Sequence, residues 1–369
     1  MKFKVNEHLV NFQKMSYVKN DEDEIHVEKD VIDCSLGINP FGYSNLISNE
    51  KELFLKTKIN IYPQYPYVEM RKEIAKYWAD VVDIRSDNIR LGNGSVGVLD
   101  TINKIFIEKN SRVLGYCPQF TEYITDVRCH GGIYEYVELK QQNNYKFDYK
   151  EIMNRMCDEH RIIYIDNPNN PTGQIIPLLQ LSDIIEKAEK MNICVIVDEA
   201  YGDFMSKENS AISLVNKFTN LFVIRTFSKG FGLADLRVGY VVCSEQLLEY
   251  YEKVDMPFTV TTVSQYISQV ALKDKMFIEN SICNIKRIKE EFINACSKIK
   301  VAETSLEVPI MVLQHPNEEI DLYKEFLKYK VLTESGEDFI AMGKNAVRLR
   351  IPENIEELLN AVKAIEKYI

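Results

Sequence analysis

The middle of the chain alternates between short apolar runs and amphipathic stretches, and this alternation most limits the possible folds. Runs rich in β-branched and aromatic residues occur at 112–116, 133–139, 161–166, 193–198, 220–226 and 237–243. Between several of them lie stretches of helical period, such as 177–192, where Leu178, Leu181, Ile184, Ile185 and Ala188 share one stripe. Strand, helix, strand in this order predicts an α/β domain, with a mostly parallel sheet covered on both faces.

The two ends of the chain differ from its middle. Residues 1–55 are polar and irregular, whereas 265–369 carry long amphipathic patterns at 277–299 and 354–369. We therefore expect a large domain over residues 56–264 and a smaller domain built from both ends, 1–55 and 265–369. A chain of 369 residues is long enough to bury a core in each.

Charge and cysteine usage narrow the class of partner. The net charge of -10 argues against nucleic acid, because such binders usually present a basic face to phosphates. The first fifteen residues scatter charges where a signal peptide needs an apolar core, and no apolar run reaches the roughly 20 residues of a membrane span. The eight cysteines are dispersed without metal-binding spacing, which favours a reducing, cytoplasmic location and small-molecule ligands.

Polar residues directly follow three of the predicted strands. "DNPNNPTG" follows 161–165, "DEAYGDF" follows 193–197, and "TFSKGFG" follows 220–225. Since ligands bind at the carboxyl ends of strands in open α/β sheets, we expect these segments to meet at one rim. That rim gathers an amide, a carboxylate, a phenol, two hydroxyls and an amine, from Asn170, Asp198, Tyr201, Thr226, Ser228 and Lys229.

An arginine joins this rim because of a short connection. About ten residues separate Thr226 from the next strand, which is fewer than a parallel crossover needs. That strand should therefore run antiparallel, so that its first residue, Arg237, lies on the same rim as Lys229.

A lysine, an acid and a phosphate-type cradle together favour pyridoxal 5'-phosphate as cofactor, held as a Schiff base. In this interpretation Asp198 keeps the ring nitrogen protonated, and Tyr201 and Asn170 hydrogen-bond the phenolic oxygen. The phosphate dianion takes charge-assisted hydrogen bonds from Arg237 together with the hydroxyls of Ser228 and Thr226.

The glycine-rich stretch "GNGSVG" at 92–97 matches the dinucleotide-binding pattern G-x-G-x-x-G. Only "NIRL" precedes it, and no short strand ending in an acid follows about 20 residues on, so a dehydrogenase is disfavoured. A glycine turn that opens a helix is a general anion seat, which predicts backbone donors to the phosphate at Gly94, Ser95 and Val96. A plain turn with a helix cap stays open as the alternative.

Six motifs in order resemble those of the fold-type I pyridoxal-phosphate aminotransferases. They are "GINPFG" (37–42), "IYPQYPYVEMRKEIA" (61–75), "NPNNPTG", "DEAYGDF", "TFSKGFGLADLRVGY" and "VRLRIP" (347–352). From about residue 32 onwards the chain looks most like the histidinol-phosphate aminotransferase group, with threonine-phosphate decarboxylase as a near relative. The resemblance implies a mostly parallel seven-stranded sheet with helices on both faces, plus a smaller α+β domain.

The resemblance also implies roles for individual residues. Lys229 corresponds to the Schiff-base lysine, Asp198 to the partner of the ring nitrogen, and Arg237 to the phosphate arginine. Phe120 falls where an aromatic ring stacks on the cofactor, and Tyr62 where a tyrosine reaches the neighbouring subunit's phosphate, which implies a homodimer with shared sites. For substrate binding, the implied residues are Arg350, as the arginine for the α-carboxylate, and Asn39 in the first motif.

The implied reaction moves an amino group between an amino acid, or an amino phosphate such as histidinol phosphate, and a 2-oxo acid. Lys229 then carries the proton between the substrate's Cα and the cofactor. A decarboxylase on the same scaffold is the alternative. A non-enzymatic sensor of this fold would need a basic DNA-binding segment, which the residues ahead of 32 do not show.

One stretch departs from the family pattern. Where the histidinol-phosphate enzymes carry an arginine for the substrate's phosphate, this chain has the acidic "TESGEDF" at 333–339. This disfavours a phosphorylated substrate, and Glu334, Glu337 or Asp338 would instead favour a cationic side chain.

Overall fold

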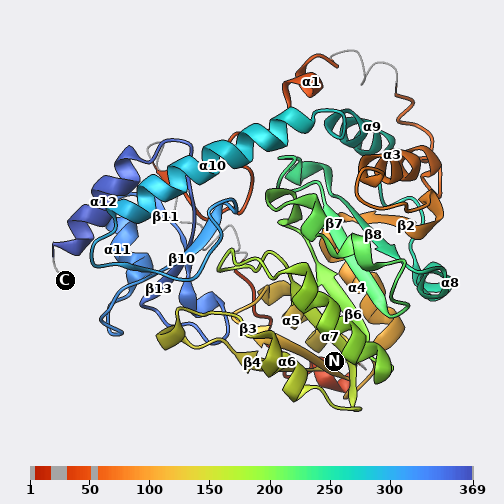
Figure 1. The fold of residues 1–369 in the computed structure, drawn as a ribbon, viewed down its shortest axis with the longest axis horizontal. Helices are drawn as coiled ribbons and strands as arrows, with labels where there is room; N and C mark the ends of the chain where they lie inside the picture. The colour runs from red at the N-terminus through yellow and green to blue at the C-terminus, as the bar shows by residue number, and fades with distance from the viewer. Residues whose placement is uncertain (1–4, 18–30, 51–56, 368–369) are drawn as a thin grey trace.

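The middle of the chain forms one seven-stranded sheet in a computed structural model, which describes residues 5–17, 31–50 and 57–367 (Figure 1). The strands are β2 (Ile89–Asn93), β3 (Arg112–Cys117), β4 (Ile133–Glu138), β5 (His160–Asp166), β6 (Cys194–Asp198), β7 (Leu221–Thr226) and β8 (Val238–Cys243). Their order across the sheet is β2, β8, β7, β6, β5, β3, β4. Strands β3 to β7 pair in parallel, and β8 runs antiparallel to both β7 and β2.

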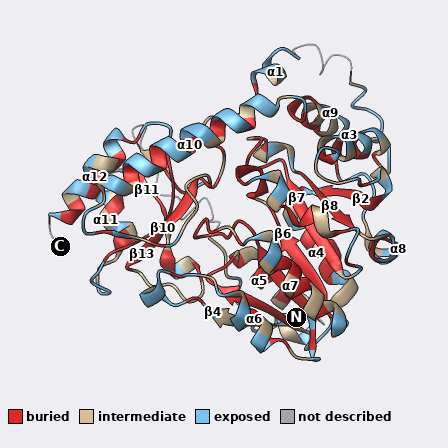
Figure 2. Ribbon diagram, viewed as in Figure 1, coloured by how far each residue is buried: buried red, intermediate tan, exposed pale blue. Residues whose placement is uncertain are grey.

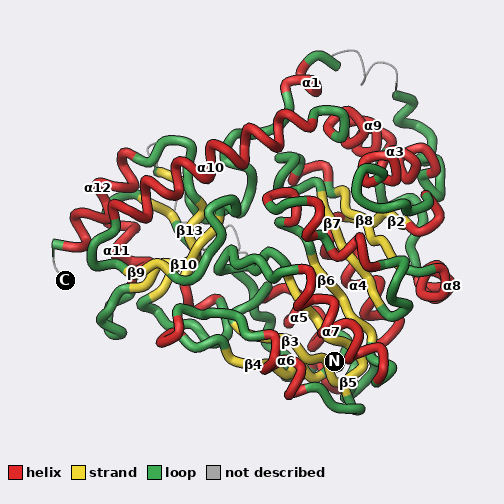
Figure 3. Tube along the Cα trace, viewed as in Figure 1, coloured by secondary structure: helices red, strands yellow, loops and turns green. Residues whose placement is uncertain are grey.

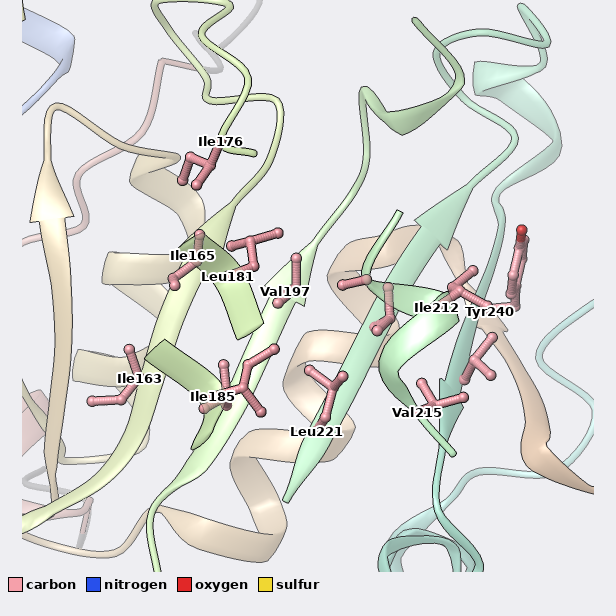
Figure 4. Packing of buried hydrophobic residues seen from close by; sticks show 14 of the residues in the cluster. Ile163, Ile165, Ile176, Leu181, Ile185, Val197, Ile212, Val215, Leu221 and Tyr240 are labelled. Atoms are coloured by element: carbon pink, nitrogen blue, oxygen red, sulfur yellow. The ribbon is translucent and has the colours of Figure 1, made fainter. Parts of the chain in front are cut away.

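Both faces of this sheet are covered by helices. Val195 and Val197 of β6 face the apolar stripe of α7 (Leu178–Lys190), whereas Ile196 packs into a separate core with α4 (Gly94–Phe106). Figure 4 shows Ile163, Ile165, Leu181, Ile185 and Val197 in contact on the first face. Because helices cover each face of the sheet, all residues of β6, β7 and β8 are buried (Figure 2). This burial explains why their sequences are mostly apolar and do not alternate with polar residues.

The other helices of this part lie around the sheet (Figure 3). They are α3 (Val68–Trp78), α5 (Thr121–Cys129), α6 (Tyr149–Arg155), α8 (Glu245–Val254) and α9 (Thr262–Ala271), with the short α1 (Asn45–Ser48) beside α9. None of the helices in the described residues is long and apolar enough to cross a membrane.

A second, smaller sheet is made from the C-terminal third of the chain. It is antiparallel and contains β12 (Glu334–Ser335), β13 (Ala346–Arg350), β10 (Ile310–Gln314) and β9 (Lys300–Val301), in that order. Beside it β1 (Ile32–Asp33) pairs in parallel with β11 (Val331–Leu332). The helices α11 (Leu322–Lys328) and α12 (Glu356–Glu366) pack here, and α10 (Lys275–Ala295) extends from beside α9 to α12 (Figure 1).

The predicted fold class is confirmed, with seven strands in the large sheet and a smaller α+β part. Each predicted strand begins and ends within one residue of the observed one, and the strand after Arg237 is antiparallel as the short connection requires. The sequence pattern did not predict β2. Its first four residues are buried, and it is a strand through its antiparallel pairing with β8.

The N-terminal segment lies elsewhere than predicted. Residues 5–17 were expected in the smaller domain, but they run along α5 of the larger part. Thr125 donates to the carbonyl of Met15 at 2.6 Å, and the His8 ring bonds the carbonyl of Cys129 at 3.0 Å. The remaining domain boundaries stay a prediction.

Candidate active site

The carboxyl ends of the central strands open onto a cavity of about 210 Å³. Its lining comprises Tyr17, Ser95, Val96, Phe120, Glu122, Asp166, Pro168, Asn170, Asp198, Ala200, Tyr201, Thr226, Ser228, Lys229, Ala234 and Arg237. Ten of the fourteen predicted site residues are among them, and the other four are Gly94, Tyr62, Arg350 and Asn39. Residues far apart in sequence meet here because parallel strands end at one edge.

Asp198 is the buried acid of the site. It ends β6, is 2% exposed, and accepts hydrogen bonds from the Tyr164 hydroxyl and the Ala200 N–H, each at 3.0 Å. Burial raises the pKa of Asp198 to about 7, and the nearby Asp166 carboxylate adds to the shift. A carboxylate so poorly solvated is suited to pair with a cationic ring nitrogen.

Asp166 is a site residue that the sequence analysis did not single out. It ends β5 directly beside Asp198, and accepts from the Tyr116 hydroxyl at 2.7 Å, the Gln119 amide at 2.9 Å and the Asn170 N–H at 2.9 Å. These bonds fix the loop that carries Asn170. Its position at the end of a predicted strand was the available signal.

Lys229 lies between the acid and the arginine of the site. It follows β7, the strand between β6 and β8, and its amine is 5.5 Å from the centre of the Tyr201 ring. Burial lowers the pKa of Lys229 to about 8, with help from the positive charges of Arg348 and Arg237 and against the pull of Asp198. The amine is therefore unprotonated, and nucleophilic, far more often than that of a surface lysine.

The Asn39 side chain hydrogen-bonds the loop that carries Lys229. Its amide donates to the Gly230 carbonyl at 2.8 Å and the Ser281 hydroxyl at 3.1 Å, while its oxygen accepts from the Phe41 N–H at 2.9 Å. Asn39 is not in the cavity lining. The structure therefore gives it a supporting position in place of the predicted substrate contact, because its polar atoms are already used.

The residues of the predicted anion cradle lie close together, except that one predicted donor is occupied. Arg237 donates to the Ser228 hydroxyl at 3.3 Å, and the Thr226 hydroxyl lies 3.0 Å from that of Ser228. Ser95 and Val96 open α4 beside them, where backbone N–H groups have no partner within the helix. The prediction for Gly94 is wrong, because its N–H donates to the carbonyl of Arg237 at 2.9 Å.

Gly94 matters instead through its missing side chain. Its φ is +69°, and a Cβ there would lie 2.4 Å from the Arg237 guanidinium. Only glycine combines that backbone conformation with so close an approach.

Neither arginine of β13 is in the cavity lining, but Arg348 hydrogen-bonds Asn170, which is. Its guanidinium donates to the side-chain oxygen of Asn170 at 3.0 Å and lies 4.9 Å from the Tyr17 ring centre. Arg350 instead donates to the backbone carbonyls of Asp33 and Ile351. The geometry thus favours Arg348 over the predicted Arg350 for a ligand in this cavity.

The acidic stretch 333–339 does not line the cavity. The Glu334 carboxylate lies 3.6 Å from the Arg348 guanidinium, and the carbonyl of Asp338 accepts from the Thr121 hydroxyl at 2.8 Å. A direct contact between these acids and a cationic substrate side chain therefore gains no support from their positions.

Tyr62 lies outside the cavity and is 80% exposed. Its ring centre is 5.0 Å from that of Phe258, on a surface that also exposes Ile59 and Ile61. Within one chain, Tyr62 does not meet the other predicted site residues.

The chain is similar to known proteins over most of its length. The model of the family "Aminotransferase class I and II" matches residues 29–365. A histidinol-phosphate aminotransferase from Methanocaldococcus jannaschii is 29% identical over 345 residues, covering 92% of this chain and 90% of the relative.

Two solved structures share the fold. That of the histidinol-phosphate aminotransferase from Clostridium acetobutylicum superposes with a TM-score of 0.82 at 24% identity, covering 92% of this chain and all of that one. The L-threonine-O-3-phosphate decarboxylase from Porphyromonas gingivalis gives a TM-score of 0.74 at 19% identity, covering 92% of this chain and 99% of its own.

Proposed function

The chain belongs to the class I and II aminotransferase family and is an aminotransferase, and from this we propose that it transfers amino groups between an amino acid and a 2-oxo acid with pyridoxal 5'-phosphate held at Lys229. The observation that carries the proposal is that Asp198, Lys229 and Arg237, from the ends of three neighbouring strands, line one cavity.

The residues of the cavity fit that cofactor. Asp198 ends β6 and Arg237 precedes β8, so one strand, β7, separates their strands and roughly 10 Å of sheet lies between them. This leaves room for an aromatic ring with a cationic nitrogen at the Asp198 end and a phosphate dianion at the Arg237 end. Phe120, half-buried in the lining, supplies an aromatic face for stacking.

When bound, pyridoxal phosphate supplies an aldehyde carbon for amines and a ring that draws electrons from the substrate's Cα. Lys229 would hold the aldehyde carbon, and its free amine would take the proton from the substrate's Cα and return it. Asp198 would keep a proton on the ring nitrogen, and Tyr201 and Asn170, which line the same cavity, would hydrogen-bond the phenolic oxygen. Arg237, Ser228, Thr226 and the start of α4 would bind the phosphate.

Arg348, rather than Arg350, is proposed to bind the α-carboxylate of the substrate. Arg348→Gln is expected to raise the KM for the amino donor by about 10- to 100-fold, because a charge-assisted hydrogen bond contributes roughly 1.5–3 kcal/mol. Arg350→Gln serves as the matched control on the same strand and should change KM less than about threefold. Steady-state kinetics measure the KM of both variants. A larger rise for Arg350→Gln than for Arg348→Gln would assign the α-carboxylate to Arg350 instead.

The titration of Lys229 should govern how fast the cofactor-free protein takes up pyridoxal phosphate. Only the unprotonated amine attacks an aldehyde, so the rate should rise about tenfold per pH unit and level off above about pH 8. Stopped-flow absorbance measures this rate. A rise that continues towards pH 10 would mean that Lys229 keeps an ordinary lysine pKa.

A homodimer is proposed from the exposed apolar surface around Tyr62. Ile59 and Ile61 are 71% and 62% exposed, and such patches mark protein–protein contacts. Ile61→Asp is expected to convert the dimer to a monomer in sedimentation, while Leu179→Asp on α7, at 75% exposure, should leave it a dimer. A wild-type monomer contradicts the proposal.

The test of the function is an amino-donor panel with the holoenzyme. Each donor, including histidinol phosphate and cationic, neutral and acidic amino acids, is offered with a 2-oxo acid while keto product and carbon dioxide are both measured. Keto product without carbon dioxide supports the aminotransferase. Carbon dioxide as the main product would instead favour the decarboxylase.

A further inference from the structure

A cysteine, a histidine and a glutamate form a chain of contacts at the other end of the large sheet. The Cys157 sulfur is 3.3 Å from Nδ1 of His160, and Nε2 of His160 is 3.3 Å from the Glu135 carboxylate. His160 begins β5, whereas the cavity described above lies at the carboxyl end of that strand. This cluster therefore takes no part in amino transfer.

Hydrogen bonds define the protonation of the His160 ring. The N–H of Cys157 donates to Nδ1 at 3.1 Å, so Nδ1 is the unprotonated nitrogen and Nε2 carries the hydrogen towards Glu135. Nδ1 thus accepts from the Cys157 N–H and also lies 3.3 Å from the thiol sulfur. A nucleophile next to a base, which a third group orients, is the arrangement of an activated nucleophile.

The surroundings hold this arrangement in place. The His160 side chain is held in a buried position, since the residue is only 3% exposed. Its backbone N–H donates to the Cys157 carbonyl at 3.1 Å, which closes a tight turn between α6 and β5. Glu135 accepts from Arg112 at 2.6 Å and lies 3.9 Å from Arg155, and Arg112 also pairs with Glu159. The ring therefore cannot turn away from the sulfur without losing several bonds.

Cys157 differs from the other cysteines of the chain. Cys34, Cys117, Cys194 and Cys243 are buried, and burial raises the pKa of the Cys129 and Cys296 thiols. Cys283 is exposed on α10, and among the bonds of the described residues no imidazole contacts it. Cys157 is half-buried and so combines access with a base.

We propose that Cys157 is a nucleophilic thiol, activated by His160 and Glu135, and a site of mixed-disulfide formation with small disulfides such as glutathione disulfide. The thiol proton passes to Nδ1 of His160, which gives up the hydrogen bond that it accepts from the Cys157 N–H, and the thiolate attacks one sulfur of the disulfide. A new sulfur–sulfur bond forms as the old one breaks, and the departing thiolate takes the proton from the imidazolium. The cysteine is oxidised and half of the small disulfide is reduced.

Competitive labelling of the holoenzyme tests the proposal, with Cys283 as an internal control. Rates of iodoacetamide alkylation at both cysteines are measured by peptide mass spectrometry between pH 6 and 8.5. The rate of an ordinary thiol falls about tenfold per pH unit below its pKa of about 8.5. We expect the Cys157 rate to fall less, so that the Cys157-to-Cys283 ratio rises about tenfold or more from pH 8.5 to 6.

His160→Gln, which can still donate to Glu135 but offers no imidazole base, should abolish this rise. Glutathione disulfide should form a mixed disulfide on Cys157 ahead of Cys283, and Cys157→Ser should remove it. A ratio that stays constant with pH in the wild-type protein overturns the proposal even if the His160 variant does not fold. Aminotransferase activity, measured in parallel, verifies folding.

Discussion

Lys229→Ala is expected to lower kcat for amino transfer by about 10⁴-fold or more. Lys229 lines the cavity together with Asp198 and Arg237, and in the proposed function it serves both as the attachment point and as the proton carrier at Cα. Alanine removes both functions while leaving the polypeptide backbone of the loop in place. Steady-state kinetics with the best donor, together with circular dichroism to verify folding, measure the effect.

A matched lysine distinguishes chemistry from structure. Lys207 is also partly buried, and burial lowers its pKa, but its amine bonds the Tyr77 carbonyl at 2.6 Å outside the cavity. Lys207→Ala should keep kcat within about twofold. Added ethylamine should restore part of the activity of Lys229→Ala, since a free amine can carry the proton. Near-wild-type activity of Lys229→Ala would refute the proposed function.

Lys289→Met is expected to destabilise the protein by about 3–5 kcal/mol. Lys289 lies on α10, fully buried, and its amine contacts four oxygens at 2.7–2.8 Å: the hydroxyl of Thr304 and the carbonyls of Ser305, Val308 and Ile310. Burial lowers the pKa of Lys289 well below its usual range, and the amine donates its hydrogens to this set. Methionine has similar length but no donor, so buried carbonyls would lose their partner.

Urea unfolding measures this loss, and the same helix offers the control. Lys286 is exposed on α10, and Lys286→Met should change the free energy of unfolding by less than about 0.5 kcal/mol. Equal stability of the two variants would show that water or backbone rearrangement replaces the lost bonds of Lys289.

The sequence could predict those residues of the site that lie at the ends of strands. Asp198, Lys229 and Arg237 flank β6, β7 and β8, and the length of the loop after Thr226 was enough to orient the last strand. The pattern could not show that the N–H of Gly94 is occupied, because its partner, the carbonyl of Arg237, lies 143 residues further along the chain.

The choice between Arg348 and Arg350 shows the same limit more clearly. The two are identical residues on one face of β13, and local periodicity gives both the same expectation. Arg348 contacts Asn170, 178 residues away, only because the smaller sheet packs against the larger one at that point. Asp166 likewise joins the site through bonds from Tyr116 and Gln119 on another strand and its following loop.

By itself the sequence determined the strand and helix periods and the order of the strands' polar ends, and hence the lysine, the acid and the arginine that are proposed to hold the cofactor. These follow from bonded geometry, in which a residue's place in a strand sets the edge it reaches. Only the tertiary structure decided which arginine of β13 lies near the cavity, which backbone N–H groups are free to bind an anion, and which thiol lies beside an imidazole. Those depend on contacts between distant segments, whose distances no local pattern encodes.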